Sequence, residues 1–378
     1  PLLLLFFQQG SLSAPLANLI AVPLVGFLVV PLTLLGTAML PFREGGGEVL
    51  VQWAATVVQW SWPALEGLTR HMPQLLHLAP AWTLLPGFIG VIWLLVPRGW
   101  PLRSLGVALL LPAFLVRPAT PPSGTAEFTL LDVGQGLAAV VQTHRHTLVF
   151  DTGPRYPSGF DTGKAVLLPF LRKQGVEQVD LLVVSHGDND HIGGARSLTE
   201  GLVVSRLVTS VPQKIAWTGT EPCRNGQSWW WDGVHFAMLH PPRHARPVRG
   251  NDDSCVLKVT AGGESVLLTG DIEAPAEREL LNSGIDLSAQ VLVAPHHGSK
   301  TSSTEAFIAA VRPQWVLYPV GYRNRYGFPR PLIQGRYRRA GVQELAGYRT
   351  GAISLMLGSN RLEPQAWRET ARRYWHSR

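Results

Sequence analysis

The chain has 378 residues, a hydrophobic fraction of 46% and a formal net charge of +7. That length is enough for two or three domains, and two cysteines are too few for a small disulfide-rich fold or a CxxC metal site. The composition is uneven, because residues 1–118 are rich in Leu, Val, Pro and Trp with few charges, whereas residues 119–378 resemble a globular domain in composition. We therefore expect a membrane region followed by a separate globular domain.

The membrane region contains apolar segments of different lengths. Residues 16–40 are almost uncharged and long enough to cross a bilayer as a helix. Pro23 and Pro31 are tolerated there if neighbouring helices satisfy the freed backbone groups. Residues 50–79 are rich in Trp, which favours a helix lying at a membrane interface over an ordinary surface helix. The chain begins at Pro1 without a signal-peptide pattern, so we expect it to be part of a longer membrane protein.

Two shorter apolar runs, 81–96 and 104–116, are joined by a turn that carries Arg98 and Arg103. Each run is near the lower length limit for a membrane-spanning helix, and together they predict a membrane hairpin. Under the positive-inside rule this turn is cytoplasmic, and the domain after residue 118 then lies outside the cytoplasm.

The globular part alternates between strand and helix patterns. Helical spacing occurs at 162–175, 273–283 and 303–311. Strands are predicted at 127–136, 137–143, 146–153, 179–185, 203–210, 234–239, 255–261, 265–271, 290–295 and 315–320. This order predicts an α/β (α+β) fold in which helices pack outside two mixed sheets, an αββα sandwich.

The segment SHGDNDHIGG at 185–194 directly follows a predicted buried strand. It offers four potential metal ligands: His186, Asp188, Asp190 and His191. Imidazole and carboxylate groups together suit zinc, manganese or iron, and the two glycines let the backbone come close as the next helix begins. We favour a metal site over a solvated polar turn.

Two later strands end in matching groups. Asp271 follows one strand in LLTGDIE, and His296 and His297 follow another in APHHGSK. The ends of such strands can converge on one edge of the fold. A pair of metal ions bridged by Asp271 would activate a water molecule and clamp the oxygens of a phosphodiester.

This arrangement resembles the metallo-β-lactamase superfamily, whose first motif is HxHxDH and whose later ligands are His, Asp and His. Asp188 stands where the second His of that motif is expected, and the intermediate His has no clear equivalent in NDDSCVL at 251–257. Fewer imidazoles favour weaker zinc binding or harder ions such as manganese. The resemblance implies two divalent metal ions, manganese or zinc.

A closer resemblance rests on LDVGQG, FDTG, SHGDNDHIGG, NDDSCVL, LLTGDIE, APHHGSKTSS and NRYGFPRP in that order. These segments are similar to the C-terminal domain of the ComEC family of competence proteins, and 15–36 is similar to the end of that family's membrane domain. The resemblance implies a multi-pass protein of the bacterial inner membrane that takes up DNA in natural transformation. Its hydrolase domain would degrade the strand that is not transported, with DNA, the membrane and the competence proteins that deliver DNA as partners. Many members have a His where Phe328 lies.

The residues predicted to bind metal are His186, Asp188, Asp190, His191, Asp271 and His297, with His296 as an alternate or outer ligand. Asp190 is also a candidate base for the attacking water. Asn251 and Ser254 are expected to hydrogen-bond the substrate or a ligand.

Lys300, Thr301 and Ser302 are expected at the start of a helix, where they would bind a phosphate. Simple helix capping is the alternative interpretation of these three residues. The residues expected to fix turns beside the site are Asp132, Gln135 and Asp151.

The positive charge is concentrated late in the chain. No carboxylate occurs between Glu305 and Glu344. That window contains Arg312, Arg323, Arg325, Arg330, Arg336, Arg338 and Arg339. Such a surface attracts nucleic acid or anionic lipid, although a solvated basic surface is an equally good interpretation of charge alone.

The cysteines leave two alternatives open. Cys223 and Cys255 could form one disulfide if the domain faces an oxidising compartment. They could equally be two free thiols, with Cys255 buried in a strand.

Three functions fit these observations. The leading hypothesis is a membrane-anchored, metal-dependent DNA nuclease that serves transformation. The second is a DNA-channel component whose hydrolase-like domain only binds and guides DNA, which the missing imidazoles favour. The third is a metallo-hydrolase that acts on another phosphodiester, such as a lipid-linked one.

Overall fold

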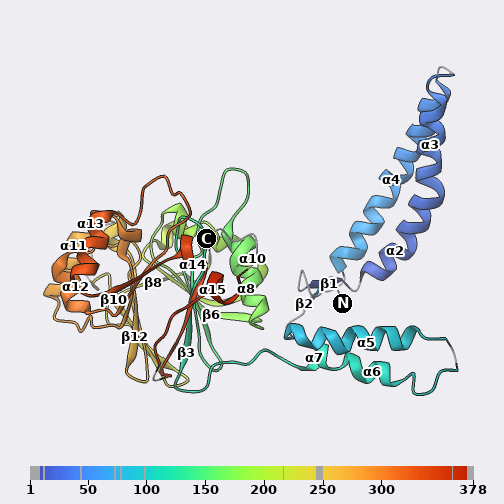
Figure 1. The fold of residues 1–378 in the computed structure, drawn as a ribbon. Coiled ribbons are helices and arrows are strands. Elements are labelled where there is room, and N and C mark those ends of the chain that lie inside the picture. The colour runs from blue at the N-terminus through green and yellow to red at the C-terminus, as the bar shows by residue number, and fades with distance from the viewer. Residues whose placement is uncertain are drawn as a thin grey trace. The chain divides into compact units, whose positions relative to one another are not determined.

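The computed structural model describes residues 9–11, 13–42, 45–71, 74–76, 79–97, 99–215, 217–243, 250–359 and 361–372. The chain divides into two compact units, Pro1–Arg117 and Pro118–Arg378 (Figure 1). The first unit contains the apolar helices, and the second contains both large sheets.

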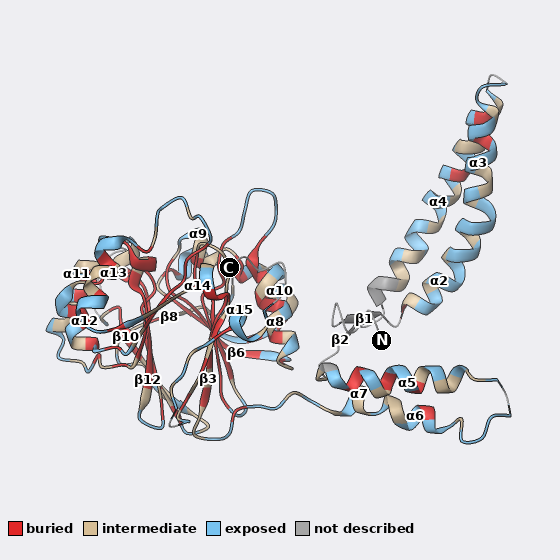
Figure 2. Cartoon of the chain, in the orientation of Figure 1, coloured by how far each residue is buried: buried red, intermediate tan, exposed pale blue. Residues whose placement is uncertain are grey.

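The first unit is helical and exposes much of its apolar surface (Figure 2). Helix α2 (Ser13–Leu24), the π-helical turn η1 (Val25–Val29) and helix α3 (Val30–Met39) follow one another without a break. Together they form a segment of 27 residues with a mean hydropathy of 2.4 over its most apolar window, of which 6% is buried. Among the described residues, it is the one helix long and apolar enough to cross a membrane.

Glycine contacts bring the helices of this unit close together. Helix α4 (Gly46–His71) packs on α3, where a Cβ atom added at Gly36 would lie 2.8 Å from the carbonyl oxygen of Gly47. Helix α5 (Leu84–Leu95) packs on α6 (Leu105–Leu110) through Gly90 and Gly106 in the same way. Such close approach at small residues is typical of helix pairs in membranes. Strand β1 (Gln9–Ser11) pairs with strand β2 (Gln74–Leu76). The other elements of this unit are η2 (Ala81–Thr83) and α7 (Pro112–Leu115).

The predicted hairpin and its arginines are only partly covered by the described residues. Helices α5, α6 and α7 are shorter than a full membrane span, and Arg103 donates a hydrogen bond from Nε to the carbonyl oxygen of Leu94 at 2.8 Å. Arg98 lies outside the described residues. The predicted cytoplasmic location of this turn therefore stays a prediction.

The second unit is a sandwich of two mixed sheets with helices on both outer faces (Figure 1). The first sheet has the order β17 (Gln365–Ala366), β16 (Ile353–Leu357), β3 (Ala126–Leu130), β4 (Ala139–Gln142), β5 (Thr147–Phe150), β6 (Gln178–Val184), β7 (Val203–Thr209) and β8 (Glu221–Pro222). The second has the order β15 (Gln343–Ala346), β14 (Trp315–Tyr318), β13 (Val291–Val293), β12 (Glu264–Leu268), β11 (Val256–Ala261), β10 (Val234–His240) and β9 (Ser228–Trp231). The predicted αββα architecture is confirmed.

Helical segments cover the outer faces of the sandwich or connect its strands. Those of the first half are η3 (Gly163–Leu167), α8 (Leu168–Lys173), α9 (Asn189–Ile192), α10 (Ala195–Gly201) and η4 (Pro212–Lys214). Those of the second half are η5 (Gly250–Asp253), α11 (Ala274–Asn282), η6 (Pro295–Gly298), α12 (Glu305–Val311), α13 (Pro331–Arg339), α14 (Gly347–Thr350) and α15 (Trp367–Thr370).

Strand β6 shows why the chain folds into layers. Its side chains are apolar on both faces, as expected of a strand buried between two layers. Leu181 and Val183 enter the core between the sheets, whereas Leu182 and Val184 pack under the outer helices. Figure 2 shows the strands buried along most of their length.

Parallel strands within each sheet set the position of the functional site. Strands β5, β6 and β7 are parallel in the first sheet, and β12, β13 and β14 are parallel in the second. In open α/β sheets, ligands bind beyond the carboxyl ends of such strands. The carboxyl ends of β5, β6, β12 and β13 lead directly into Asp151, His186, Asp271 and the segment 295–298.

The two cysteines form a disulfide that joins the sheets. Cys223 directly follows β8 of the first sheet, and Cys255 directly precedes β11 of the second. Their Cα atoms are 6.0 Å apart, and both side chains are buried. The structure therefore favours the disulfide over the two free thiols that the sequence left equally open.

Candidate metal centre

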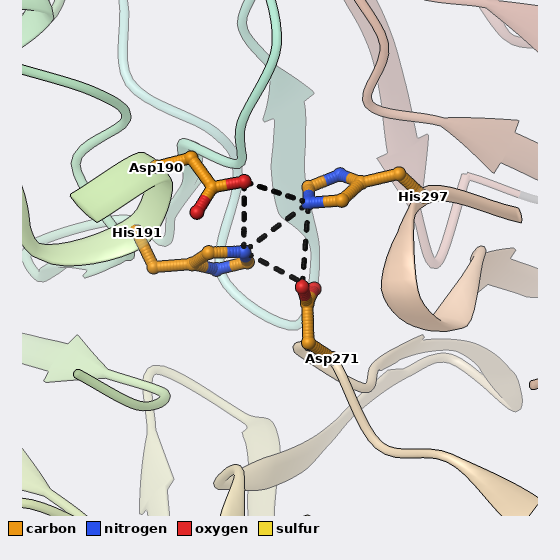
Figure 3. Close-up of side chains that lie close together, drawn as sticks. All are labelled: Asp190, His191, Asp271 and His297. Carbon is orange, nitrogen blue, oxygen red and sulfur yellow. Dashed lines mark hydrogen bonds and ion pairs between the residues drawn. The ribbon is translucent and has the colours of Figure 1, made fainter. Parts of the chain in front are cut away.

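Four predicted ligands from three chain segments converge at the end of the sandwich (Figure 3). Asp190 and His191 lie on α9, Asp271 follows β12, and His297 lies on η6 after β13. One ligand atom from each of the four lies within 4.8 Å of all the others. The two sheets each contribute two of these side chains, so the cluster depends on how the sheets pack.

The distances within this cluster are short enough for one ion to be shared. The Nε2 atoms of His191 and His297 are 3.3 Å apart. Asp271 Oδ1 lies 3.1 Å from His191 Nε2, and Asp271 Oδ2 lies 3.5 Å from His297 Nε2. Asp190 Oδ2 is 3.3 Å from His297 Nε2 and 4.0 Å from His191 Nε2. Two imidazole nitrogens and two carboxylates that face one point are a common donor set for zinc, manganese or iron.

Hydrogen bonds to the far ring nitrogens orient both imidazoles. His297 Nδ1 lies 2.9 Å from the carbonyl oxygen of Pro319, which can only accept. His191 Nδ1 lies 2.7 Å from the carboxylate of Asp151, which is also an acceptor. Each ring therefore carries a proton on Nδ1 and turns Nε2 toward the cluster, where a metal ion would take the place of any proton on that nitrogen. Such outer hydrogen bonds to ligand imidazoles are usual at metal sites.

Asp151 was expected to fix a turn, and it also orients the imidazole of the predicted ligand His191. Its Oδ1 accepts a hydrogen bond from the backbone N–H of Ser185 at 2.6 Å, and its Oδ2 accepts from the Ser185 hydroxyl at 2.7 Å. The same Oδ2 accepts from His191. The signal in the sequence was an aspartate directly after the buried strand β5 in FDTG.

Two buried atoms in the cluster have no hydrogen-bond partner among the described residues: His186 Nε2 and Asp271 Oδ1. Asp271 Oδ1 lies 3.1 Å from His191 Nε2 but is not aligned for a hydrogen bond. Leaving such groups unsatisfied costs about 1–3 kcal/mol each. A cation bound at each of these atoms would remove that cost, so the residues present fit divalent metal ions.

The charges in the cluster reinforce one another. Burial alone would raise the pKa of Asp271, but the charges and hydrogen bonds of His191 and His297 hold it well below its usual range. Burial would lower the pKa of His297, but Asp271 and Asp190 raise it to about 9. Burial would raise the pKa of Asp190, yet His297 and His191 hold it at about 2. A carboxylate with so low a pKa is a weak base, so Asp190 is better suited to bind metal than to accept a proton.

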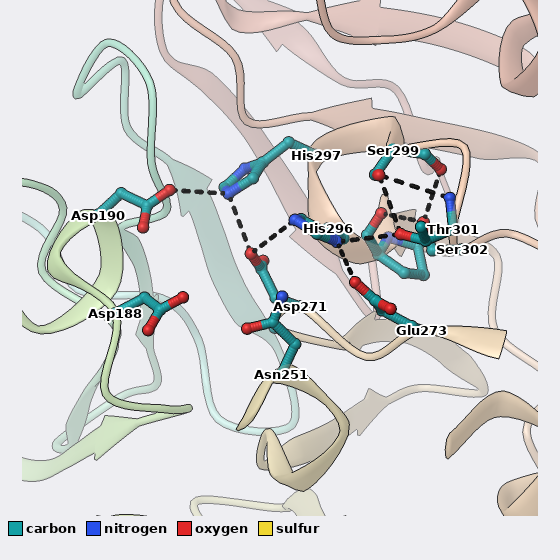
Figure 4. A network of polar contacts seen from close by, with 12 residues as sticks. Asp188, Asp190, Asn251, Asp271, Glu273, His296, His297, Ser299, Thr301 and Ser302 are labelled. Carbon is teal, nitrogen blue, oxygen red and sulfur yellow. Dashed lines mark hydrogen bonds and ion pairs between the residues drawn. The ribbon is translucent and has the colours of Figure 1, made fainter. Parts of the chain in front are cut away.

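The other three predicted ligands also lie near Asp271, and Figure 4 shows two of them, Asp188 and His296. His186 Nε2 is 3.7 Å from Asp188 Oδ2 and 4.0 Å from Asp271 Oδ2. His296 Nε2 is 3.8 Å from the same Asp271 oxygen, and its Nδ1 lies 3.0 Å from Glu273 Oε1. Asp271 thus lies between two groups of donors. Sequence reasoning gave no role to Glu273, although it follows Asp271 in LLTGDIE.

The predicted substrate-binding residues differ in where they lie. The Ser254 hydroxyl is fully buried, donates to the Asn251 carbonyl oxygen at 2.7 Å and accepts from the Asp271 backbone N–H at 3.1 Å. Ser254 therefore positions Asp271. The Asn251 side chain lies beside Asp271 in Figure 4.

The expected helix start at Lys300 is wrong. Helix α12 begins at Glu305, and its capping residue is Thr304, whose hydroxyl accepts from the Phe307 N–H. Lys300 is exposed on the preceding loop. The Ser302 hydroxyl donates to the Pro295 carbonyl oxygen, and Thr301 Oγ1 lies 3.3 Å from His296 Nδ1. The hydroxyls of Thr301 and Ser302 therefore support η6, a role that the sequence did not predict.

Residues 131–321 match the family described as Metallo-beta-lactamase superfamily, and residues 1–101 match the family described as Competence protein. The chain is 34% identical over 376 residues to a protein named Competence protein ComA from Neisseria gonorrhoeae, covering 98% of this chain and 52% of that protein. It is 28% identical over 386 residues to ComE operon protein 3 from Bacillus subtilis, covering 93% of this chain and 49% of that protein. The chain spans about half the length of these relatives.

A solved structure with a similar fold is CmlA, a diiron beta-hydroxylase from Streptomyces venezuelae. It is 15% identical, with a TM-score of 0.42, and the match covers 63% of this chain and 55% of that chain. The superfamily match, which includes all seven predicted ligands, covers half of this chain and supports a metal-dependent hydrolase. The chain belongs to the metallo-beta-lactamase superfamily and carries a competence-protein segment ahead of that domain.

Proposed function

We propose that this chain is a membrane-anchored, metal-dependent nuclease that takes part in DNA uptake and degrades the strand that is not transported. The observation that carries the proposal is the convergence of Asp190, His191, Asp271 and His297 within 4.8 Å. The competence-family match of residues 1–101 supports DNA as the substrate and the membrane as the location.

The donor positions favour two ions bridged by Asp271. His191, His297 and Asp190 would hold one ion together with Asp271, and His186, Asp188 and His296 would hold a second one together with Asp271. When bound, two such ions supply Lewis acidity and a water nucleophile at neutral pH. Manganese or zinc fits these donors.

The chain's own residues would orient this chemistry. Asp151 and the Pro319 carbonyl hold the His191 and His297 rings with Nε2 inward. Ser254 holds the backbone of Asp271. These contacts fix the ligands before the substrate arrives, which is the main way a protein contributes to such catalysis.

A location outside the cytoplasm agrees with the disulfide between Cys223 and Cys255, because disulfides persist in oxidising compartments. The proposed anchor is the apolar segment Ser13–Met39. Helices α5, α6 and α7 would complete a multi-pass arrangement with neighbouring segments of a longer protein.

The test is a nuclease assay on the full chain in detergent, stripped of metal and then supplied with manganese, zinc or magnesium. Single-stranded and duplex DNA are the substrates, and Asp190→Ala is the inactive variant. Asp286→Ala is the matched control, because Asp286 is an exposed carboxylate paired with Lys258. We expect metal-dependent cleavage that Asp190→Ala abolishes and Asp286→Ala retains.

Two other outcomes would replace the proposal. Salt-sensitive DNA binding without cleavage in any metal would indicate a domain that only guides DNA. Cleavage of small or lipid-linked phosphodiesters without cleavage of DNA would indicate a hydrolase for another substrate.

A further inference from the structure

A groove of about 680 Å³ opens beside the metal centre. Asp188 and Asp190 are among the residues that line it, so a molecule in the groove lies next to two of the predicted ligands. The other residues that line it are Gln135, Pro154, Arg155, Tyr156, Pro157, Asn189, Arg325 and Tyr326. The lining therefore combines aromatic and basic side chains with the two carboxylates of Asp188 and Asp190.

Gln135 has an unusual environment in this groove. Both polar atoms of its side-chain amide are buried, and neither has a hydrogen-bond partner among the described residues. The surrounding backbone is tightly packed, because a Cβ atom added at Gly321 would lie 2.7 Å from the backbone nitrogen of Gln135. The next residues are tied to the metal loop, since the Leu137 N–H donates to the Asp190 carbonyl oxygen at 3.1 Å. An amide whose donor and acceptor both lack a partner matches a ligand that offers both.

Aromatic side chains on two loops provide planar surfaces for such a ligand. Tyr156 and Tyr326 line the groove and are 43% and 41% exposed. Tyr326 stacks on Phe328 with ring centroids 5.6 Å apart, and Phe328 stacks on His297 at 6.4 Å. The Arg325 guanidinium lies 4.8 Å above the Tyr326 ring. A series of stacked planar groups therefore leads from a metal ligand into the groove.

Three arginines of the basic window, Arg336, Arg338 and Arg339, contact other parts of the domain. Arg338 and Arg339 form ion pairs with Glu344 and Glu305, each at 2.8 Å. Arg336 donates to the backbone carbonyl oxygens of Ser302 and Ser303. These three arginines already have partners within the domain, whereas Arg155 and Arg325 line the groove and are the better candidates to bind phosphate.

We propose that this groove binds one unpaired nucleotide of the DNA strand, with its base between Tyr156 and Tyr326 and its base edge hydrogen-bonded to the Gln135 amide. Arg155 and Arg325 bind the adjacent phosphates. The inference rests on the proposed function and adds the form of the substrate. A base edge and both base faces are accessible only in a single strand or at a frayed end, so the interior of a duplex is excluded. Aromatic stacking beside basic side chains is the usual means of binding single strands.

The test measures binding rather than cleavage, in EDTA, with the full chain in detergent. The probes are fluorescein-labelled oligonucleotides: a thymidine 12-mer, an abasic 12-mer with the same phosphates, and the thymidine 12-mer paired in a duplex. We expect Tyr326→Ala to weaken binding of the thymidine 12-mer by about 5- to 150-fold, the range for losing a stacked base, and Gln135→Ala to weaken it by about 2- to 13-fold, the range for losing a hydrogen bond. Binding of the abasic 12-mer stays unchanged.

Tyr322→Ala is the matched control. Tyr322 lies on the same loop as Tyr326 and is 67% exposed, and it is not among the residues that line the groove. It should change binding by less than about 2-fold. The inference is overturned if the wild type binds the thymidine and abasic 12-mers equally, or if Tyr326→Ala and Gln135→Ala behave like Tyr322→Ala.

The same measurement separates this inference from the proposed function. A wild-type chain that cleaves DNA but does not distinguish the two 12-mers refutes the groove and leaves the nuclease intact. A chain that prefers bases, loses that preference in both variants and cleaves nothing refutes the nuclease and leaves the groove intact.

Discussion

Replacing Asp151 by Asn tests whether the second layer of hydrogen bonds prepares the metal centre. Asp151 is fully buried and accepts from the Ser185 N–H, the Ser185 hydroxyl and His191 Nδ1. An asparagine has one acceptor oxygen and one donor amide in place of two acceptors. If its amide faces His191, the imidazole must accept at Nδ1, and its proton moves to Nε2, where it blocks the metal. If its amide faces the Ser185 N–H instead, two donors oppose each other.

Either orientation has a cost that can be estimated. A buried donor left without an acceptor costs about 1–3 kcal/mol of stability. Loss of the outer partner of a ligand imidazole typically lowers metal affinity by about 10- to 100-fold, which equals about 1.4–2.7 kcal/mol. We therefore expect Asp151→Asn to reduce both the melting temperature and the affinity for manganese or zinc.

Isothermal titration of the metal-free chain, together with thermal unfolding, measures both effects. Asp161→Asn is the control, because Asp161 is also buried and accepts from the Lys164 N–H and the Ser197 hydroxyl. It should lose comparable stability and keep wild-type metal affinity. If Asp151→Asn binds metal as tightly as Asp161→Asn does, the orienting role assigned to Asp151 is refuted.

Three further changes test other contacts. Ser254→Ala removes the hydroxyl that holds the Asp271 N–H and should lower stability by about 1–3 kcal/mol and weaken metal binding in the same titration. Replacing both Cys223 and Cys255 by Ser should cost about 3–4 kcal/mol of unfolding free energy for a separation of 32 residues, and a reductant should give the wild type the same lower melting temperature. Burial would raise the pKa of Asp232, but hydrogen bonds from Thr143, His146 and the Arg145 N–H hold it at about 2, below the unfolded value of about 3.9. Its contribution is present above that unfolded value and is lost as the pH falls through about 2, so the melting-temperature difference between wild type and Asp232→Asn should close between about pH 4 and pH 2.

The sequence predicted the layers and the ligand-bearing strand ends because both depend on local patterns. A run such as VDLLVV is apolar on both faces, and a polar motif directly after it marks the carboxyl end of a buried strand. Long-range pairing has no such local signal. The edge strands β8, β9, β15 and β17 were missed, and so was β16, which lies next to β17. Short strands near sheet edges are defined mainly by their partners.

The basic window shows the same limit. Between Glu305 and Glu344 the sequence contains no carboxylate, so the whole window was expected to form one positive surface. In the fold, Glu305 and Glu344 return to pair with Arg339 and Arg338. The glutamates are at the two ends of the window in the sequence, and only the tertiary structure brings them to its arginines.

The disulfide lies beside two residues, Ser185 and Ser254, that also support the predicted metal centre. An oxidising compartment preserves this disulfide, and this connects the location of the domain with its predicted site. The Cys255 N–H donates to the Ser185 carbonyl oxygen at 2.9 Å. Ser185 precedes the predicted ligand His186 and contacts Asp151, while Ser254, directly before Cys255, holds the backbone of Asp271. Because the ligands come from both sheets, any shift of one sheet against the other would separate them. The Cys223–Cys255 disulfide joins the two sheets one residue from Ser254, and it therefore restricts such a shift close to the predicted ligands.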